Sequence, residues 1–344
     1  MKIVIDESIP FIRDVFEPFA QVGYVKGVEM SAADVRDADA IIIRSRTKCG
    51  ASLLDGSSVK VIATANIGID NIDLDYCSSH GIFVRNASGC NAGGVANYVF
   101  SALYGVAARK AIRLDGTTIG IIGVGNVGRR VESMANILGF NVLRYDPPRA
   151  ENEGAYDFCT LDYLLKNSNI VTFHSPLNDA TRGMANDEFF SKMRPGTIFI
   201  NASRGEIMDE NALKTAASKL GAIVIDTWNN EPDIDEELLD LADIATPHIA
   251  GYSYQGKLNG TASAVRTVAR FFDIKELMDF YPKSEIAELN SVKLDVREKS
   301  QGEIASLFQY NYPIFTDDFL LRVNPSDFLK LRKDYRYRKE FYIE

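Results

Sequence analysis

The sequence lacks any apolar run long enough to cross a membrane, and the segment Met1–Glu7 turns acidic too early for a secretion signal. Cysteine is also scarce. The four thiols, Cys49, Cys77, Cys90 and Cys159, show no C-x-x-C spacing, which is typical of a reducing compartment and unlike a disulfide framework or a metal site. We therefore expect a cytoplasmic protein with no bound metal and no membrane partner.

An excess of positive charge is absent as well. Asp and Glu number 47 against 38 Lys and Arg, so the net charge is -9. This balance argues against nucleic acid or an anionic membrane as the main partner, and an anionic substrate would have to be attracted by local cations. A length of 344 residues is long for one hydrophobic core, which favours two domains or two domains with an appendage.

A glycine turn follows the apolar segment Thr117–Ile122 and precedes a helical pattern over Arg129–Leu138. Gly123 suits a tight turn, Gly125 would let the backbone approach a pyrophosphate, and Gly128 would let the helix pack close to the sheet. A lone G-x-G-x-x-G motif is weak evidence for a nucleotide site. The strand before it and the helix after it make a dinucleotide site the better interpretation.

An acidic residue stands where such a site needs one. The predicted strand Asn141–Tyr145 ends at Asp146, 18 residues beyond Gly128. A carboxylate there would accept hydrogen bonds from the ribose hydroxyls and repel a 2′-phosphate, so we predict NAD as the cofactor. Arg149 is the counterargument, because an arginine nearby can accommodate the phosphate of NADP.

Strands alternate with helices along most of the chain, which predicts α/β architecture with parallel sheets. In such sheets ligands bind at the carboxyl ends of the strands. We predict two doubly wound parallel-sheet domains, one of the Rossmann type and one flavodoxin-like, with a small C-terminal α+β appendage. The expected strands lie near residues 3–5, 40–43, 59–63, 82–84, 117–122, 141–145, 169–173, 197–201, 222–226 and 243–245, and an amphipathic helix is expected over Phe11–Phe19.

Two long helices set the predicted domain boundaries. The helix over Asn91–Lys110 is long enough to carry the chain from one domain to the next, and Gly260–Phe272 could return it. The prediction is a discontinuous substrate domain of residues 1–92 and 254–280, a nucleotide-binding domain of residues 93–253, and a C-terminal region of residues 281–344.

The C-terminal region is too short for an ordinary independent core. It is nevertheless rich in aromatic side chains, which need a surface to cover them. We predict that it forms a homodimer contact, the alternative being packing onto its own chain. The cations of the helical segment 328–335 are expected to be solvated, with a polyanion site as the alternative. The aromatic residues are Phe308, Tyr310, Tyr312, Phe315, Phe319, Phe328 and Phe341.

Five motifs together resemble the D-isomer-specific 2-hydroxyacid dehydrogenases over about residues 1–280. They are the glycine turn and the segments 174–177 (HSPL), 201–205 (NASRG), 226–232 (DTWNNEP) and 246–251 (TPHIAG). Residues 44–48, 88–92, 146–149 and 248–257 are similar to members that oxidise a phosphorylated four-carbon hydroxy acid in pyridoxal phosphate biosynthesis. Asn66 and Asn97 depart from that pattern, where Thr and Glu are expected.

Hydride transfer from such a substrate requires a group that holds the carboxylate and a base for the hydroxyl proton. Of the three histidines, His80 precedes a turn on the amino side of a strand and suits packing, while His174 better suits a loop near the cofactor. The resemblance gives the acid/base role to His248. Glu231 could orient its imidazole, and Arg204 could bind the carboxylate bidentately.

The remaining site residues come from the resemblance and from strand ends. The cofactor cradle is predicted to comprise Gly123, Gly125, Asn126, Val127, Gly128, Asp146, Ser175, Ala202, Ser203, Arg204, Asp226 and Gly251. The substrate residues are predicted to be Arg44, Ser45, Arg46, Lys48, Asn66 and Tyr252, with the cationic loop facing a phosphate. Two alternatives stay open: a dehydrogenase for phosphoglycerate or hydroxypyruvate, and a nucleotide-sensing corepressor, which can keep the same three catalytic residues.

Overall fold

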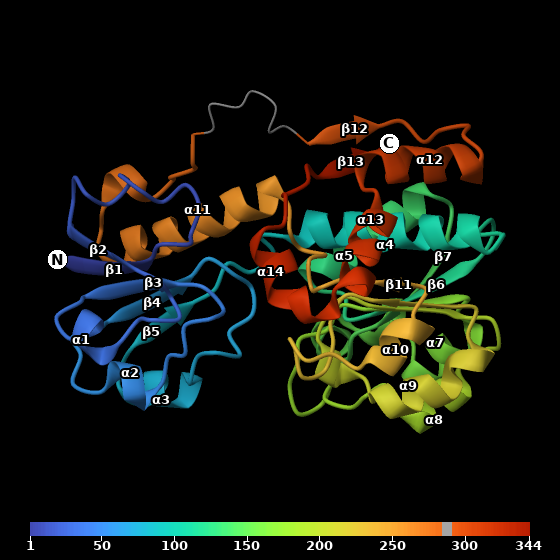
Figure 1. Cartoon of the computed structure of the whole chain (residues 1–344), viewed down its shortest axis with the longest axis horizontal. Helices are drawn as coiled ribbons and strands as arrows, with labels where there is room; N and C mark the ends of the chain where they lie inside the picture. The colour runs from blue at the N-terminus through green and yellow to red at the C-terminus, as the bar shows by residue number, and fades with distance from the viewer. Residues whose placement is uncertain (284–290) are drawn as a thin grey trace. The chain divides into compact units, whose positions relative to one another are not determined.

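The computed structural model describes residues 1–283 and 291–344, and the chain divides into two compact units (Figure 1). Unit 1 comprises residues 1–91 together with the segment that starts at Ser253, and unit 2 comprises residues 92–252 and 291–344. Residues 284–290, which fall within the predicted C-terminal region, lie outside the described part. Among the described helices, none combines the length and the apolar character needed to cross a membrane.

Unit 1 is a five-stranded parallel sheet in the order β2-β1-β3-β4-β5. Its central strands β3 and β4 are buried throughout, as expected for a sheet covered on both faces. The strands are β1 (Lys2–Asp6), β2 (Gln21–Val25), β3 (Ala40–Ile43), β4 (Val61–Thr64) and β5 (Phe83–Arg85).

Helices cover both faces of this sheet. The long helix α11 (Tyr254–Phe271) buries Val265 and Val268 in one core, together with Ile12 and Phe16. Three short helices bury Val35, Leu54 and their neighbours in the other core. These helices are α1 (Ala32–Val35), α2 (Ala51–Leu54) and α3 (Leu74–Ser79), and a 3-10 turn, η4 (Lys275–Leu277), follows α11.

The helix predicted over Phe11–Phe19 is wrong. Phe11 and Asp14 both have a φ of 62°, in the left-handed region that interrupts a right-handed helix. Ile12 and Phe16 are nevertheless buried in the core. Their four-residue spacing, which predicts a helix, arises here because consecutive turns of the chain each direct one apolar side chain into the core.

Unit 2 is a six-stranded parallel sheet in the order β11-β10-β9-β8-β6-β7. The chain runs from β6 to β7 on one side and then crosses to β8 on the other, so the strand order reverses beside β6. In open α/β sheets this reversal is where ligands bind. The strands are β6 (Thr118–Ile122), β7 (Asn141–Tyr145), β8 (Ile170–Phe173), β9 (Ile198–Asn201), β10 (Ala222–Ile225) and β11 (Ile244–Ala245).

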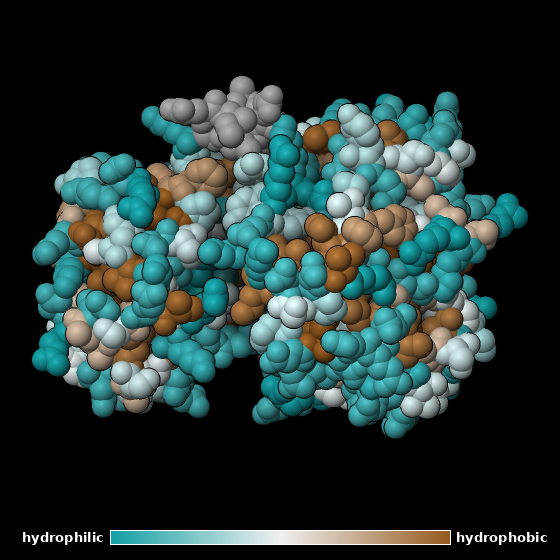
Figure 2. Space-filling model, in the orientation of Figure 1, coloured by the Kyte–Doolittle hydropathy of each residue, from teal (hydrophilic) through white to brown (hydrophobic). Residues whose placement is uncertain are grey.

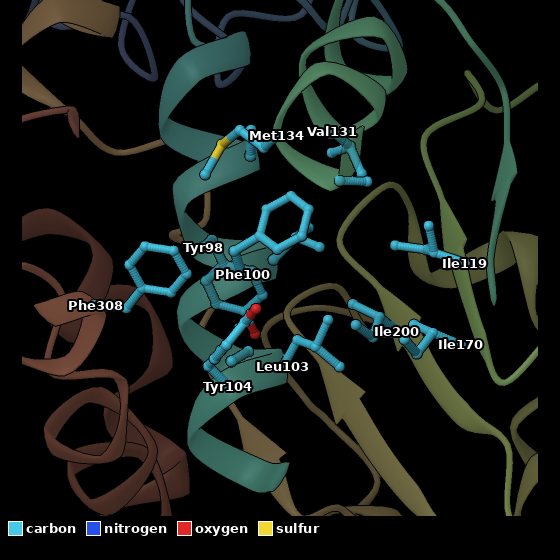
Figure 3. Close-up of a cluster of buried hydrophobic side chains, with 14 of the residues drawn as sticks. Tyr98, Phe100, Leu103, Tyr104, Ile119, Val131, Met134, Ile170, Ile200 and Phe308 are labelled. Atoms are coloured by element: carbon cyan, nitrogen blue, oxygen red, sulfur yellow. The ribbon is translucent and has the colours of Figure 1, made fainter. Parts of the chain in front are cut away.

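One face of this sheet is covered by α4 (Ala92–Arg109) and α5 (Asn126–Ile137). Figure 3 shows side chains of α4 packed between Phe308 and the sheet residues Ile119, Ile170 and Ile200. The opposite face is covered by α7 (Leu161–Asn167), α8 (Asp187–Lys192), α9 (Glu210–Ala216) and α10 (Glu236–Leu241). Shorter elements of the unit are α6 (Pro147–Glu153), η1 (Ala155–Asp157), η2 (Gly205–Ile207) and η3 (Ala217–Lys219).

The described C-terminal residues pack within unit 2. The side chain of Asn97 on α4 donates to the carbonyl oxygen of Phe341 at 2.8 Å and accepts from its backbone N–H at 2.9 Å. Phe308, Tyr312, Phe328 and Phe341 are buried against their own chain, whereas Tyr310 and Phe319 are 87% and 62% exposed. The elements are β12 (Val292–Leu294), α12 (Gln301–Asn311), α13 (Ile314–Val323), η5 (Pro325–Asp327), α14 (Phe328–Lys333) and β13 (Phe341–Ile343).

Candidate active site

His248 lies three residues beyond the carboxyl end of β11, in a left-handed backbone conformation with φ 54°. Non-glycine residues adopt this conformation rarely and only where the surroundings hold it. Here the backbone N–H of His248 donates to the carbonyl oxygens of Asp226 at 2.8 Å and Thr246 at 3.0 Å. The imidazole is therefore aimed by a turn that two hydrogen bonds fix.

The carboxylate of Asp226 holds the loop that carries His248. Its Oδ1 accepts from the backbone N–H of Ile249 and the hydroxyl of Thr246, and its Oδ2 accepts from the N–H of Ala250, at 2.7–3.0 Å. Burial raises the pKa of Asp226, although the nearby His248 and these donors oppose that rise. The structure thus gives Asp226, predicted as a cofactor residue, a direct part in positioning the histidine.

Glu231 and His248 form a hydrogen-bonded pair. The imidazole Nδ1 lies 2.8 Å from Oε2 and 3.1 Å from Oε1 of the carboxylate, whose Oε1 also accepts from the backbone N–H of Trp228 at 3.0 Å. Burial alone would raise the pKa of Glu231, but these bonds and the charges of His248 and Arg332 bring it below its usual value. An ionised carboxylate requires the proton on Nδ1, which leaves Nε2 to exchange protons.

Arg332 contacts the Glu231 carboxylate of this pair, which the sequence did not predict. Its Nη1 lies 3.5 Å from Oε2 of Glu231, and its guanidinium lies over the ring of Phe328. The side chain is 22% exposed, and its Nε is buried with no hydrogen-bond partner in the described part of the chain. The sequence indicated only a basic face over residues 328–335, so the expectation of solvated cations is wrong for Arg332.

Arg204, Glu231 and His248 line one pocket of about 530 Å³. Arg204 follows β9, and its Nη1 donates to the carbonyl oxygen of Ser203 at 2.8 Å. A Cβ on the next residue, Gly205, would meet the backbone of Trp228 at 2.0 Å, so only glycine lets these two loops meet. Arg182 also lines the pocket and was not predicted.

The three glycines of the turn differ in their surroundings. Gly123 has φ +87°, and a Cβ there would lie 2.6 Å from the backbone nitrogen of Ser175. A Cβ on Gly128 would lie 2.1 Å from the carbonyl oxygen of Gly123. Among the described residues other than its two chain neighbours, none has an atom within 4 Å of a Cβ placed on Gly125. Gly123 and Gly128 are thus required by the fold, whereas the space above Gly125 is open at the start of α5.

Two buried hydroxyls near the same sheet edge fit a bound cofactor. The Oγ atoms of Ser175 and Ser203 are buried and have no hydrogen-bond partner in the described part of the chain. Buried polar groups are normally satisfied, so these hydroxyls suit a ligand with polar groups of its own. The other predicted cradle residues lie along that edge: Asn126 begins α5 with Val127 next to it, Ala202 follows β9, and Gly251 follows the His248 loop.

His174 also stands at this edge, after β8, but its environment is unlike that of His248. Its Nε2 lies 3.0 Å from the hydroxyl of Thr172, and its Nδ1 is buried without a partner in the described residues. Burial lowers the pKa of His174 to about 3. The ring is therefore neutral at physiological pH, which suits a wall of the cofactor site.

Asp146 is placed at the end of β7 as predicted, and its carboxylate ties two segments together. Oδ2 accepts from the backbone N–H of Val124 at 2.8 Å, and Oδ1 accepts from that of Arg149 at 3.1 Å. Arg149 in turn donates to the carbonyl oxygen of Val124 and forms an ion pair with Glu153. Two of the carboxylate's roughly four acceptor positions are thus used within the chain, and further hydrogen bonds can still be accepted.

The predicted substrate loop belongs to unit 1, at the carboxyl end of β3. Ser45, Arg46 and Lys48 are exposed, while Arg44 donates to the carbonyl oxygen and hydroxyl of Ser8 at 3.2 and 3.3 Å. The amide oxygen of Asn66, oriented to satisfy its neighbours, accepts from the N–H of Ser45 at 2.9 Å. Tyr252 belongs to unit 2, where its ring contacts Tyr335 and Tyr337 edge-on.

Known proteins resemble this chain in both sequence and fold. Residues 102–250 match the model of the D-isomer specific 2-hydroxyacid dehydrogenase NAD binding domain. Erythronate-4-phosphate dehydrogenase of Bacteroides fragilis is 42% identical over 99% of this chain and 97% of the relative, and the enzyme of that name from Escherichia coli O1:K1 is 38% identical over 99% and 92%.

Solved structures agree. NAD-bound 3-phosphoglycerate dehydrogenase of Entamoeba histolytica is 27% identical, with a TM-score of 0.67 over 79% of this chain and 96% of that one. D-Lactate dehydrogenase of Aquifex aeolicus, in complex with NAD and lactic acid, is 25% identical, with a TM-score of 0.65 over 82% and 98%. The predicted fold class and NAD cofactor are confirmed, and the chain belongs to the erythronate-4-phosphate dehydrogenases of the D-isomer specific 2-hydroxyacid dehydrogenase family.

Proposed function

We propose that this protein uses NAD to oxidise 4-phospho-D-erythronate at C2 to 2-oxo-3-hydroxy-4-phosphobutanoate. The observation that carries the proposal is the convergence of Arg204, Glu231 and His248 on one pocket, with the imidazole 2.8 Å from the carboxylate. Relatives that bear the name of this activity align with almost the whole chain. The reaction would serve pyridoxal 5′-phosphate synthesis, and the small number of cysteines without C-x-x-C spacing supports a place in the cytoplasm.

The chemistry follows from the protonation state of the pair. With Nδ1–H donated to Glu231, Nε2 of His248 takes the proton of the C2 hydroxyl, and the carboxylate stabilises the imidazolium that forms. Arg204 holds the C1 carboxylate, for which a guanidinium has matching geometry. NAD, when bound, would supply the nicotinamide ring as the acceptor of the C2 hydride. In the reverse direction His248 returns the proton.

The cofactor would be held along the edge of the unit 2 sheet. The open space above Gly125 supports close approach of the pyrophosphate. The hydroxyls of Ser175 and Ser203 are buried and could form hydrogen bonds with the cofactor. Asp146 would accept from the ribose hydroxyls. These features fit a dinucleotide, and the roles of the individual residues are part of the proposal.

For the phosphate of the substrate we propose the loop Arg44–Lys48. Ser45, Arg46 and Lys48 are exposed at a strand end, and guanidinium and ammonium groups form charge-assisted hydrogen bonds with phosphate. Arg44 contacts Ser8, so its guanidinium is held in place by the chain itself. Asn66, hydrogen-bonded to Ser45, would help to set the loop.

The test compares kcat/KM for 4-phosphoerythronate with that for erythronate, 3-phosphoglycerate and glycerate. We expect a strong preference for the four-carbon phosphate, which Arg44→Ala and Lys48→Ala should each reduce by about tenfold, as expected for the loss of a charged hydrogen bond. Lys26→Ala is a matched control, because Lys26 is an exposed cation of unit 1 that pairs with Glu29. The substrate assignment would be disproved if the wild type had the same kcat/KM for erythronate as for 4-phosphoerythronate, or a higher kcat/KM for the three-carbon acid.

We further propose that the protein is a homodimer whose contact includes α13. Phe319, Leu320 and Val323 on this helix are 62%, 45% and 54% exposed, and Figure 2 shows hydrophobic atoms over that part of the surface. Exposed apolar patches of this kind are typical of interaction sites. Phe319→Asp with Leu320→Asp should convert a dimer to a monomer in analytical ultracentrifugation. Tyr310→Asp, on α12, is a control for an exposed ring outside that helix.

A further inference from the structure

A second pocket, of about 350 Å³, lies wholly within unit 1. One wall is the stripe Asn259, Ser263, Arg266, Thr267 and Arg270, whose spacing of three and four residues places it on one face of α11. The other wall is Arg85 at the end of β5 and the segment 88–90. Its size is at the lower end of the range for small-molecule sites.

The charge of this pocket is one-sided. Arg85, Arg266 and Arg270 line it, and none of the described lining residues is an aspartate or a glutamate. Within the described part of the chain, none of the three forms an ion pair with a carboxylate. The protein as a whole carries a net charge of -9, so three guanidinium groups without an ion pair among the described residues, all around one hollow, are unlike the average surface.

Two of these arginines are also fixed in place. Nε of Arg266 donates to the carbonyl oxygen of Phe280 at 2.7 Å, and Nη2 of Arg270 donates to that of Met278 at 3.3 Å. Each guanidinium has five N–H donors, so each keeps donors for a ligand after these bonds. Solvated surface cations sample many rotamers, whereas these side chains are already ordered, which lowers the entropy lost on binding.

We propose that this pocket binds a small phosphate-bearing anion. Like charges held together repel one another, and an anion removes that repulsion and satisfies the spare N–H donors. Arginine matches phosphate through paired hydrogen bonds, and the hydroxyls of Ser263 and Thr267 on the same wall add further donors. The site differs from the substrate loop Arg44–Lys48, none of whose residues line it.

Residues that line the pocket also lie close in sequence to both boundaries between the two segments of unit 1 and unit 2. Residues 88–90 precede the crossing after Asn91, and Asn259 follows the crossing before Ser253. An anion bound here would bridge the end of β5 to α11, two segments that are joined through the whole of residues 92–252. We therefore expect the anion to stabilise unit 1.

Isothermal titration of the full-length protein with inorganic phosphate tests the proposal. The variant Arg266→Gln/Arg270→Gln should bind phosphate at least about tenfold more weakly than the wild type, since two charged hydrogen-bond donors are lost. Lys26→Gln/Lys275→Gln removes the same charge from exposed positions of unit 1 outside the pocket and should bind as the wild type does. Arg44→Ala/Lys48→Ala removes the cations of the proposed substrate loop, so this variant should retain the phosphate that binds at the pocket on α11.

Thermal unfolding without phosphate establishes that each variant is folded, and Arg266→Lys/Arg270→Lys is the substitute if the glutamine pair is not. Equal binding by the pocket variant and the wild type, or no binding by the wild type, would overturn the proposal. If Arg44→Ala/Lys48→Ala lost all phosphate binding, the measured binding would belong to the substrate loop and the pocket on α11 would not bind phosphate. An increased KM for the hydroxy acid in Arg266→Gln/Arg270→Gln, without added phosphate, would show that the pocket is not a separate site. Absence of phosphate binding at this pocket would leave the activity proposed above standing, because that activity is tested separately through kcat/KM for the hydroxy acid.

Discussion

Replacing Gly125 by alanine should weaken NAD binding while leaving the fold intact. Apart from its two chain neighbours, no atom of the described residues lies within 4 Å of the added Cβ, so we expect the packing of the turn to tolerate it. The backbone of Gly125, at φ -78°, avoids the left-handed region that would exclude alanine. In the proposed cofactor site, however, the same methyl group would occupy the space that the pyrophosphate approaches.

Two magnitudes follow. Gly125 is the N-cap residue of α5, where alanine is less favourable than glycine, and we expect a loss of about 0.5–1 kcal/mol in unfolding free energy. Pressing a methyl group against a bound ligand resembles overpacking, which costs about 1–3 kcal/mol. That corresponds to a roughly 5- to 150-fold increase in the Kd for NAD.

Gly128→Ala is the matched comparison within the same turn. Its Cβ would lie 2.1 Å from the carbonyl oxygen of Gly123, so the helix and the turn must separate whether or not NAD is present. We expect Gly128→Ala to lower the midpoint of thermal unfolding clearly and Gly125→Ala to lower it only slightly.

The assays are calorimetric titration with NAD and thermal unfolding of the free protein. If Gly125→Ala bound NAD as tightly as the wild type, the pyrophosphate would not lie over this residue, and the placement of the cofactor would be wrong. If Gly125→Ala instead unfolded at the same temperature as Gly128→Ala, the fold would not have free space for a Cβ at residue 125.

Four further results are expected. His248→Asn should reduce kcat by about 10²–10⁴, as for loss of a general base, and normal turnover would refute its role. Arg332→Gln should raise the pKa of Glu231, so that on the acid side of the pH profile activity is lost at a higher pH than in the wild type. The two groups are 3.5 Å apart and partly exposed, so the lost interaction is worth about 1 kcal/mol. Arg332→Lys keeps the positive charge and should restore the wild-type pH profile. His174 stays neutral in the folded protein down to about pH 3, whereas the unfolded chain binds a proton below about 6.5, so its contribution to stability is present above pH 6.5 and lost as pH falls. Urea unfolding should show up to about 1.4 kcal/mol less stability per pH unit in that window, and His174→Gln should be less sensitive. Asp146→Ala should reduce the preference for NAD over NADP. If the ratio of the Kd for NADP to the Kd for NAD were unchanged, Asp146 would not contact the ribose of the cofactor.

The central strands were predictable because their signals are local. The fully apolar run Ala40–Ile43 and the segment Asn141–Tyr145 have the bounds that the sequence indicates. The edge strand β2 (Gln21–Val25) was missed, since it is only partly buried and carries no continuous apolar run. The helix α13 was missed as well, because its mixed pattern serves both the core and the surface.

The predicted catalytic residues come from strand ends, and the parallel sheet brings them together. That much follows from topology, since the carboxyl ends of β9, β10 and β11 share one edge. The contact of Arg332 with Glu231 joins residues about 100 positions apart and depends on how the C-terminal helices pack. No local pattern encodes such a contact, and only the basic face of its helix hinted at it.

The interrupted course of unit 1 has a consequence for its synthesis. The five strands of its sheet are complete once the ribosome has reached Arg85, but α11, which covers one face, begins at Tyr254. At about 5–20 residues per second, the intervening residues take roughly 10–30 s to translate. During that time Ile3, Ile42 and Ala63, all fully buried in the finished protein, lack the helix that covers them. Unit 1 must wait for α11 throughout this interval, so the nascent N-terminal sheet is a part of the chain that a chaperone would need to shield.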